Sequence, residues 1–386
     1  MASSQWIRVS KHLPCKICKS ADWCSITRDG AVAKCMRVES GCFKSKDDRN
    51  GGHYYLHRLT VGPHFDSNVP VQSSPEPARA DVETLSEVYT ALLARLSLSE
   101  LHRENLQGRG LDDNAIEKCG FKTLRVQGRS RIVGDLRGFF GDKLLGVPGF
   151  IAKHGRSGPY LTLSGSAGLL VPCRDRVGRV MALKVRRDDA IQDRPRYSYI
   201  SSVDHGGPGP GSPLHFPLGW PEEAEVVRLI EGELKADIVQ ELTGLPTLSI
   251  PGASNWRPAL HELKALGCKT VRLAFDVDAS DNPIVARGLS ACSDALAEAG
   301  FAVQLERWCV ADGKGLDDLL AAGKTPDVLQ GNAAHFAICE ISASATSEEE
   351  PAPPDELARV QEVIRMGGRK PYSGTTPYCK LSRTKQ

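Results

Sequence analysis

Two aspartates flank a single valine in the segment RLAFDVDASDN, residues 272–282. The apolar residues 273–275 predict a buried strand, and Asp276 and Asp278 follow it directly. If the chain is still extended there, both carboxylates point to the same side of the strand and repel each other. A divalent cation such as Mg²⁺ would make that arrangement tolerable, because it prefers carboxylate oxygens. Solvation of an ordinary acidic loop is the simpler alternative, which this short motif alone does not exclude.

Strand and helix patterns alternate along residues 222–323, which contain this motif. Such alternation predicts a mostly parallel sheet with helical crossovers, and ligands of such sheets bind beyond the carboxyl ends of the strands. The acidic clusters of the region fall at these ends, so we predict a metal site on the rim of the sheet. The clusters are Glu231 with Glu233, Asp276 with Asp278, and Asp312 with Asp317 and Asp318. The predicted strands are residues 224–233, 246–250, 270–278 and 302–309, and the predicted helices are 234–244, 256–267, 284–300 and 315–323.

Five of the twelve cysteines lie in the first 42 residues. Cys15 and Cys18 have the Cys-x-x-Cys spacing that lets two thiolates reach one tetrahedral ion from a tight turn. Residues 23–35 predict a hairpin, turning at an Asp-Gly pair, that returns Cys35 to the same place. A zinc ribbon is favoured over free thiols, since a region with few large apolar side chains needs such a staple. For the fourth ligand we choose His57, while Cys42, Cys24 and His53 remain alternatives.

Basic residues are concentrated in two parts of a chain whose net charge is only +2. Residues 1–60 contain 11 Lys and Arg against 5 Asp and Glu, and residues 121–200 contain 16 against 6. Two basic blocks beside an acidic rim indicate a polyanionic partner such as nucleic acid. No apolar run approaches the ~20 residues of a membrane span, and the first residues contain no apolar signal region. We expect a cytoplasmic protein without membrane contact, whose cysteines are free thiols or metal ligands.

Three acidic segments resemble, in order, the motifs of the Toprim domain, which bacterial and phage primases share with topoisomerases and some nucleases. These segments are LIEGELKADIV, LAFDVDAS and DGKGLDDLLAAG, residues 229–239, 273–280 and 312–323. Residues 168–201 resemble the basic segment that precedes Toprim in bacterial-type primases, and residues 104–121 resemble the Arg-Gly-Leu segment that opens the same core. With the cysteine motif, residues 10–330 therefore resemble a bacterial or phage-type DNA primase.

Two departures from that pattern favour the phage and mobile-element branch of the family. The Asp-x-Asp pair is followed by ASDNPIVARG, residues 279–288, in place of a short Ala-Gly step. The ribbon opens with Cys-x-x-Cys, as in phage relatives, but residues 36–38 are Met-Arg-Val where a second cysteine pair is expected. The sequence contains no Walker motif, so we expect no internal ATPase.

The resemblance implies a metal-dependent nucleotidyltransferase that makes short RNA primers on single-stranded DNA. It implies that Glu231, Asp276 and Asp278 are catalytic, and that these three bind Mg²⁺ or Mn²⁺ together with Asp317 and Asp318. Zn²⁺ in the ribbon, ribonucleoside triphosphates and a replicative helicase are the other expected cofactors and partners. The residues expected to contact nucleotides or DNA are Arg174, Arg179, Lys184, Arg186, Arg187, Arg196, Tyr197 and Lys235.

The expected fold class is α/β: a Toprim domain with a mostly parallel sheet between helices, preceded by an α+β primase-core subdomain and a small zinc ribbon. The expected boundaries are ribbon 1–62, linker 63–81, basic α+β subdomain 82–221, Toprim domain 222–335, and acidic tether with basic tail 336–386. The subdomain is predicted to begin with two helices in residues 82–120, separated at 108–112, and to continue as strands.

Two other functions are alternatives to the primase hypothesis. The first is a Toprim nuclease, which would not need a basic triphosphate-binding segment ahead of the Toprim motifs. The second is a non-catalytic DNA-binding protein, in which we would expect motif carboxylates to be missing. This chain has both the basic segment and the carboxylates, so its sequence favours a primase.

Overall fold

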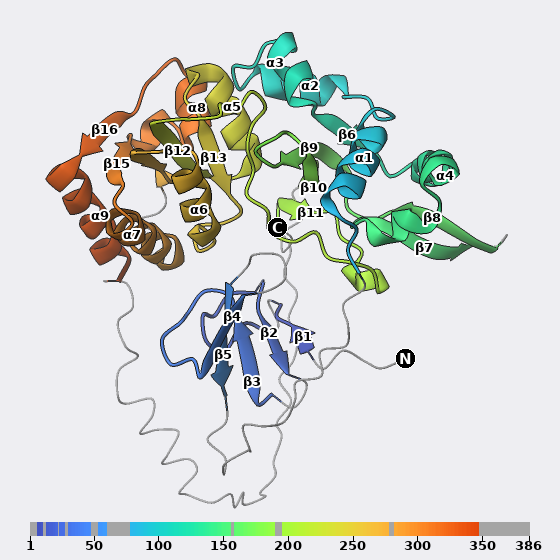
Figure 1. Cartoon of the computed structure of the whole chain (residues 1–386), viewed down its shortest axis with the longest axis horizontal. Coiled ribbons are helices and arrows are strands. Elements are labelled where there is room, and N and C mark those ends of the chain that lie inside the picture. Colours follow the sequence, from blue (N-terminus) through green and yellow to red (C-terminus); the bar gives the residue numbers. More distant parts are fainter. Residues whose placement is uncertain are drawn as a thin grey trace, which may run out of the picture. The chain divides into compact units, whose positions relative to one another are not determined.

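The computed structural model describes most of the chain between Trp6 and Thr346 (Figure 1). The described residues are 6–10, 13–21, 23–27, 30–47, 53–59, 78–155, 158–189, 195–277 and 282–346. Asp278, most of the expected linker and the basic tail lie outside these residues, so their predicted roles stay predictions. Among the helices of the described ranges, none is both long and apolar enough to cross a bilayer.

Five short strands near the amino terminus form an antiparallel sheet in the order β1-β2-β3-β5-β4. The predicted hairpin is confirmed, because β2 and β3 pair with Ser25 opposite Lys34. Gly30 beside the turn has φ = 72°, a value that favours glycine. The buried residues of this region are few, and three of them are cysteines. The strands are β1 Trp6–Arg8, β2 Ser25–Thr27, β3 Val32–Cys35, β4 Lys44–Asp47 and β5 His53–Arg58.

Three helices follow where two were predicted: α1 Val82–Leu93, α2 Glu100–Gln107 and α3 Asp113–Cys119. The break at residues 108–112 is confirmed, and a second break lies between α1 and α2. Ser99 accounts for it, because its hydroxyl caps α2 by accepting a hydrogen bond from the His102 amide, 3.4 Å away. Ser99 therefore marks the start of α2, and the apolar periodicity around it does not reveal this start.

An antiparallel sheet in the order β11-β10-β9-β6 forms the centre of the basic region. Strands were expected in this region and are present, whereas α4 with its two internal glycines was not predicted, because glycine weakens the helical signal. Gly168 opens β9 where no side chain fits, since a Cβ there would lie 2.1 Å from the Arg186 carbonyl oxygen. The elements are β6 Lys122–Leu124, α4 Arg129–Phe140, η1 Gly141–Gly146, β7 Phe150–Gly155, β8 Gly158–Leu163, β9 Gly168–Arg174, β10 Val180–Arg187, β11 Tyr197–Tyr199 and η2 Val203–His205.

The carboxyl-terminal sheet has the order β13-β12-β14-β15-β16 and is parallel except for β16. The predicted alternation of strands and helices is confirmed, and β16 adds an antiparallel edge that was not predicted. These elements are β12 Val226–Glu231, α5 Glu233–Thr243, β13 Thr247–Ile250, α6 Arg257–Ala265, β14 Thr270–Ala274, α7 Pro283–Glu298, β15 Ala302–Arg307, η4 Val310–Asp312, α8 Leu316–Ala321, β16 Asp327–Gln330 and α9 Gly331–Thr346.

Helices cover both faces of this sheet (Figure 1). On β12, Leu229 packs with α6, α7 and α9, while the next residue, Ile230, packs with α5 and α8. This alternation is why β12 is a continuous apolar run, as expected for a strand buried on both faces. Helix α9 continues to Thr346, although the tether was expected from residue 336. Its small residues gave little helical pattern, yet Ile338 is buried against the sheet.

Two residues on α9 test whether this helix belongs to the folded core. Ile338→Ala is expected to lower the free energy of unfolding by about 2–4 kcal/mol, because Ile338 is 3% exposed and a cavity would remain. Phe336→Ala is the matched control, since Phe336 is 65% exposed, and its effect should stay within about 0.5 kcal/mol. Denaturant unfolding measures both. Equal effects of the two substitutions would mean that α9 does not pack as described.

Candidate functional site

Three carboxylates gather at the carboxyl ends of neighbouring parallel strands, and we call them the acidic centre: Glu231, Asp276 and Asp317. Glu231 ends β12, and Gly232 follows with φ = 101°, which lets the chain turn into α5. Asp276 follows β14, and Asp317 lies in the first turn of α8. Strand β14 was expected to extend through Asp278, but it ends at Ala274, before Asp276. Asp278 itself lies outside the described residues. The predicted rim is nevertheless where these side chains lie.

Asp317 is the most enclosed of the three, with 1% of its surface exposed. Its Oδ2 accepts a hydrogen bond from Arg109, whereas its Oδ1 is buried and has no hydrogen-bond partner among the described residues. Burial raises the pKa of Asp317, against the opposing attraction of Lys235 and Arg109. Gly315 leaves room for this carboxylate, since a Cβ there would come within 2.5 Å of Oδ1. A buried oxygen without a partner is costly, so this atom fits a site for a cation.

Two basic side chains of the protein reach the same carboxylates. Lys235, one turn into α5, donates through Nζ to Asp276 Oδ1, as Arg109 does to Asp317. Burial also raises the pKa of Glu231, and Lys235 opposes that rise. Within the described ranges, no three carboxylate groups bring oxygen atoms within 4.8 Å of one another. The carboxylates therefore share one rim without forming a closed ligand set, and their oxygen-only chemistry suits Mg²⁺ or Mn²⁺.

Glu233 lies behind this rim, joined to the basic sheet. It is 2% exposed, and its two oxygens accept hydrogen bonds from Lys184 Nζ at 2.6 Å and the Tyr199 hydroxyl at 2.5 Å. Burial raises the pKa of Glu233, but the Lys184 ammonium and these hydrogen bonds outweigh it and leave the pKa below its ordinary value. Lys184 also lies over the Tyr199 ring, 4.8 Å from the centroid. A buried ion pair thus connects strand β10 to the start of α5.

The predicted nucleotide-binding residues divide into buried and exposed sets. Arg174 is buried and donates to the Cys119 carbonyl oxygen at 2.6 Å, and Lys184 is engaged with Glu233, so neither presents a free cation to solvent. Arg187 is buried and pairs with Asp189 at 2.9 Å, Arg179 pairs with Asp175 and Glu83, and Lys235 pairs with Asp276. Arg196 and Tyr197 are exposed, and the half-buried Arg186 donates to Asn105 at 3.2 Å. These three are the best placed of the set to meet a polyanion.

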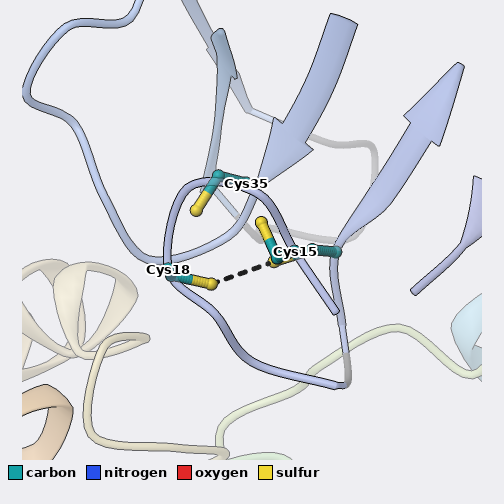
Figure 2. Close-up of side chains that lie close together, drawn as sticks. Cys15, Cys18 and Cys35 are labelled. Atoms are coloured by element: carbon teal, nitrogen blue, oxygen red, sulfur yellow. Dashed lines mark hydrogen bonds between the residues drawn. The ribbon is translucent and has the colours of Figure 1, made fainter. Parts of the chain in front are cut away.

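Four cysteines near the amino terminus form a second candidate site, which we call the cysteine cluster: Cys15, Cys18, Cys24 and Cys35. Their sulfur atoms all lie within 4.8 Å of one another. Figure 2 shows the side chains of Cys15, Cys18 and Cys35 gathered between the loop and the strands. Hydrogen bonds from the Cys15 and Cys24 thiols lower the pKa of Cys18, while the pKa of Cys24 is raised, first by Cys15. Four sulfurs this close together can act jointly as ligands of one metal ion.

The prediction of His57 as the fourth ligand is corrected by this cluster. His57 is buried, and its Nε2 lies 2.8 Å from the Val38 carbonyl oxygen, so it is committed to the backbone of the ribbon. Cys24 is the fourth member of the cluster because Ser25 pairs with Lys34, and this register places Cys24 beside Cys35 at the open end of the hairpin. Cys42 and His53 are not members of the cluster.

Several site residues have no obvious signal in the sequence. Arg109 and Asp317 are 208 positions apart, and only the packing of α2 and α3 against α5 brings them together. The buried His215 is another: its Nδ1 accepts the Arg174 backbone N–H at 3.0 Å, and its Nε2 donates to Asp237 at 3.1 Å. The spacing of Asp237, four residues after Glu233, was the available hint, since it repeats the face of α5 that meets the basic sheet.

Comparisons with known proteins give similar folds at low sequence identity. No family model matches the chain. The gene 57 protein of Mycobacterium phage D29 is 32% identical over 99 residues, which are 26% of this chain and 58% of that relative, so the chain spans little more than half its length.

Bacterial primase domains are among the similar solved structures. A DNA primase domain from Pseudomonas aeruginosa is 14% identical with a TM-score of 0.49, covering 74% of this chain and 97% of that one. The zinc-binding and RNA polymerase domains of Aquifex aeolicus primase are 14% identical with a TM-score of 0.48, covering 90% and 80%. The E. coli primase catalytic core is 17% identical with a TM-score of 0.47, covering 74% and 90%. Identities this low and TM-scores below 0.5 leave the function to be inferred from this chain's own residues.

The raised pKa of Glu231 predicts a stability change in the metal-free protein. A carboxyl group whose pKa is higher in the folded than in the unfolded chain loses stability as the pH rises through that pKa. Glu231→Gln should therefore raise Tm at about pH 8 by roughly 2–4 °C, and the gain should shrink at about pH 4, where the wild-type carboxyl is protonated. Glu298→Gln, on the exposed side of α7, is the control and should change neither value. A lower Tm at the higher pH would contradict the buried environment of Glu231.

Proposed function

We propose that this chain is a DNA primase that joins ribonucleotides into short RNA primers on single-stranded DNA. The observation that carries the proposal is the buried, unpaired Oδ1 of Asp317 on the same rim as Glu231 and Asp276, since an oxygen atom so placed suits a bound cation. The order of the acidic motifs along the chain, which resembles that of primases, supports nucleotidyl transfer as the use of that cation. The neighbouring basic sheet and the cysteine cluster support a nucleic acid as the substrate.

The acidic centre would hold Mg²⁺ or Mn²⁺ through Glu231, Asp276 and Asp317, with Asp278 and Asp318 as further candidate ligands. When bound, the cation supplies charge neutralisation at the triphosphate and at the departing pyrophosphate. Glu231 lies on the same rim and, if it does not hold the cation itself, would accept the proton of the attacking hydroxyl. The ion pair of Glu233 with Lys184 fixes the β12–α5 turn on which Glu231 lies.

The nucleic acid would meet the face of the basic sheet that carries Arg186 and Tyr197, which are paired across β10 and β11. The Arg186 guanidinium suits a phosphate, and the exposed Tyr197 ring suits stacking on a base. Arg196 precedes Tyr197 and is exposed as well. Single-stranded DNA and ribonucleoside triphosphates are thus the proposed partners, and a replicative helicase is the further partner that the sequence resemblance suggests.

The cysteine cluster would bind one Zn²⁺. Four sulfur ligands without an open position are typical of a structural zinc site, and the ribbon has too few buried apolar residues to fold well without one. The backbone amides of Met36 and Val38 each lie 3.4 Å from a cysteine sulfur, and such donors stabilise thiolates. Residues 36–38 therefore support the cluster where the phage pattern has cysteines.

Zinc analysis tests the identity of the fourth ligand. The purified wild-type protein should contain about one zinc per chain, and Cys24→Ser should lose most of it, because three ligands hold the ion poorly. Cys42→Ser is the matched control and should retain the metal, since Cys42 is outside the cluster. Full zinc in the Cys24 variant, or zinc lost equally in both, would show that another residue completes the site.

A primer-synthesis assay tests the proposed activity. With single-stranded DNA, labelled ribonucleotides and Mg²⁺, the wild type should give short RNA products, and Asp276→Asn should lower their yield at least ~100-fold, since the centre loses a charge that holds the cation. The fold should survive, because the amide has the size of the carboxylate and its oxygen can still accept a hydrogen bond from Lys235. Asp294→Asn, exposed on α7, is the control and should remain active.

The same assay separates the competing functions. Cleavage of the DNA without nucleotide incorporation would identify a nuclease. DNA binding without either reaction would identify a non-catalytic protein. Full activity of Asp276→Asn would rule out the acidic centre as the site of the reaction.

A further inference from the structure

We propose that Arg37 is a positioning residue of the zinc site, whose guanidinium offsets the negative charge of the cysteine cluster and slows release of the ion. The inference rests on the proposed zinc binding and goes beyond it, since it assigns a role to a side chain that is not a ligand. Arg37 donates through Nη1 to two sulfurs, 4.0 Å from Cys18 Sγ and 3.9 Å from Cys24 Sγ. Arg37 is half-buried, so salt and water screen this contact less than they screen a pair on the surface.

Cys18 and Cys24, the two cysteines that Arg37 contacts, form one edge of the cluster. Their sulfur atoms lie 3.6 Å apart. Two sulfurs bound to one tetrahedral zinc ion, each at about 2.3 Å, would lie about 3.8 Å apart, so this edge already has nearly the spacing of a ligand pair. Because the guanidinium lies against both sulfurs, its single charge acts on half of the expected ligand set.

The charge of a four-sulfur site is the reason that a guanidinium would change its stability. Four thiolates around one Zn²⁺ leave a net charge of about −2. Cys15, Cys24 and Cys35 are buried, so water can offset little of that charge. A charge kept away from water is costly unless neighbouring donors stabilise it, and groups beside the ligands commonly change metal affinity by about 10- to 100-fold.

The guanidinium is the charged donor among those that residues 36–38 bring to the cluster. The backbone amides of Met36 and Val38 each lie 3.4 Å from a cysteine sulfur. These amides contribute partial charges, whereas the side chain of Arg37 contributes a full positive charge. Substitution of Arg37 leaves the amides in the chain, so it tests the guanidinium separately from the backbone that surrounds it.

Competition for zinc between the zinc-loaded, full-length protein and a chromogenic chelator tests this role. Arg37→Gln should lower zinc affinity about 10- to 100-fold, because the thiolates lose a charge that offsets their own. Arg37→Lys keeps the charge but not the guanidinium fork, so its loss should be smaller. Lys19→Gln is the matched control, since it removes the same charge beside Cys18. Lys19 Nζ donates to the Lys16 carbonyl oxygen at 3.3 Å, and affinity should change by less than about 3-fold.

Cobalt in place of zinc gives a readout that a change in folding alone would not move. Co²⁺ bound by cysteines has an absorption band in which an electron passes from sulfur to the metal. Loss of the guanidinium raises the energy of the sulfur electrons, so the band should move to longer wavelength in Arg37→Gln and stay in place in Lys19→Gln. Arg37→Met provides a second charge-free side chain, to be measured if thermal unfolding shows that the glutamine variant does not fold.

The outcomes distinguish this inference from the proposed zinc binding. Equal zinc affinity in the wild type and Arg37→Gln, or an unmoved cobalt band, would overturn the role of Arg37 and leave the zinc site standing. An equal loss of affinity in Arg37→Gln and either Arg37→Lys or Lys19→Gln would overturn it as well, since the contact of this one charge would then not be the cause. A wild type that binds no zinc would overturn both.

Discussion

Repulsion among carboxylates at the end of a parallel sheet is the constraint on which the arrangement of this protein depends. Parallel strands end on one edge, so Glu231 and Asp276 cannot avoid each other once β12 and β14 pair. Helix α8 then adds Asp317, which is almost fully buried. Without countercharge these groups would oppose folding, and the chain supplies it through Lys235 from within the same region and Arg109 from the preceding one. The acidic centre therefore determines how the two regions must meet.

Helix α5 is the element through which they meet. Its first turn carries Glu233, which accepts hydrogen bonds from Lys184 and Tyr199 of the basic sheet. Farther along, Leu234 and Ile238 pack with apolar residues of α2, α3 and β9. The same helix thus makes a polar contact that orients it against the basic sheet. It also makes an apolar contact whose burial supplies most of the free energy that holds the two regions together. A cation bound by Glu231 and a strand bound on the face of β10 and β11 would consequently lie on parts that move together.

The sequence was informative wherever a pattern is local. Alternating apolar periods predicted the parallel strands and their helices, and the Asp-Gly turn predicted the hairpin that carries the cysteines. It was uninformative where partners are far apart, as for Arg109 and Asp317, because no local pattern records a contact across 208 positions. Lys184 was expected to bind phosphate on the basis of its charge, but its carboxylate partner comes from another region. Strand register distinguishes Cys24 from His57 as the fourth member of the cluster, and the spacing of cysteines and histidines along the chain does not contain it.

The two candidate metal sites differ in a way that follows from their surroundings. The cysteine cluster is closed: four sulfurs face one another, backbone amides lie against two of them, and Arg37 donates to Cys18 and Cys24. Without an ion the ribbon would have crowded thiols and very little apolar core, so an ion bound there would serve folding. The acidic centre is open: its countercharges are flexible side chains, and the sheet beneath it is buried on both faces without any ion. An ion held there would therefore be exchangeable without loss of the fold, as the proposed nucleotidyl transfer would need.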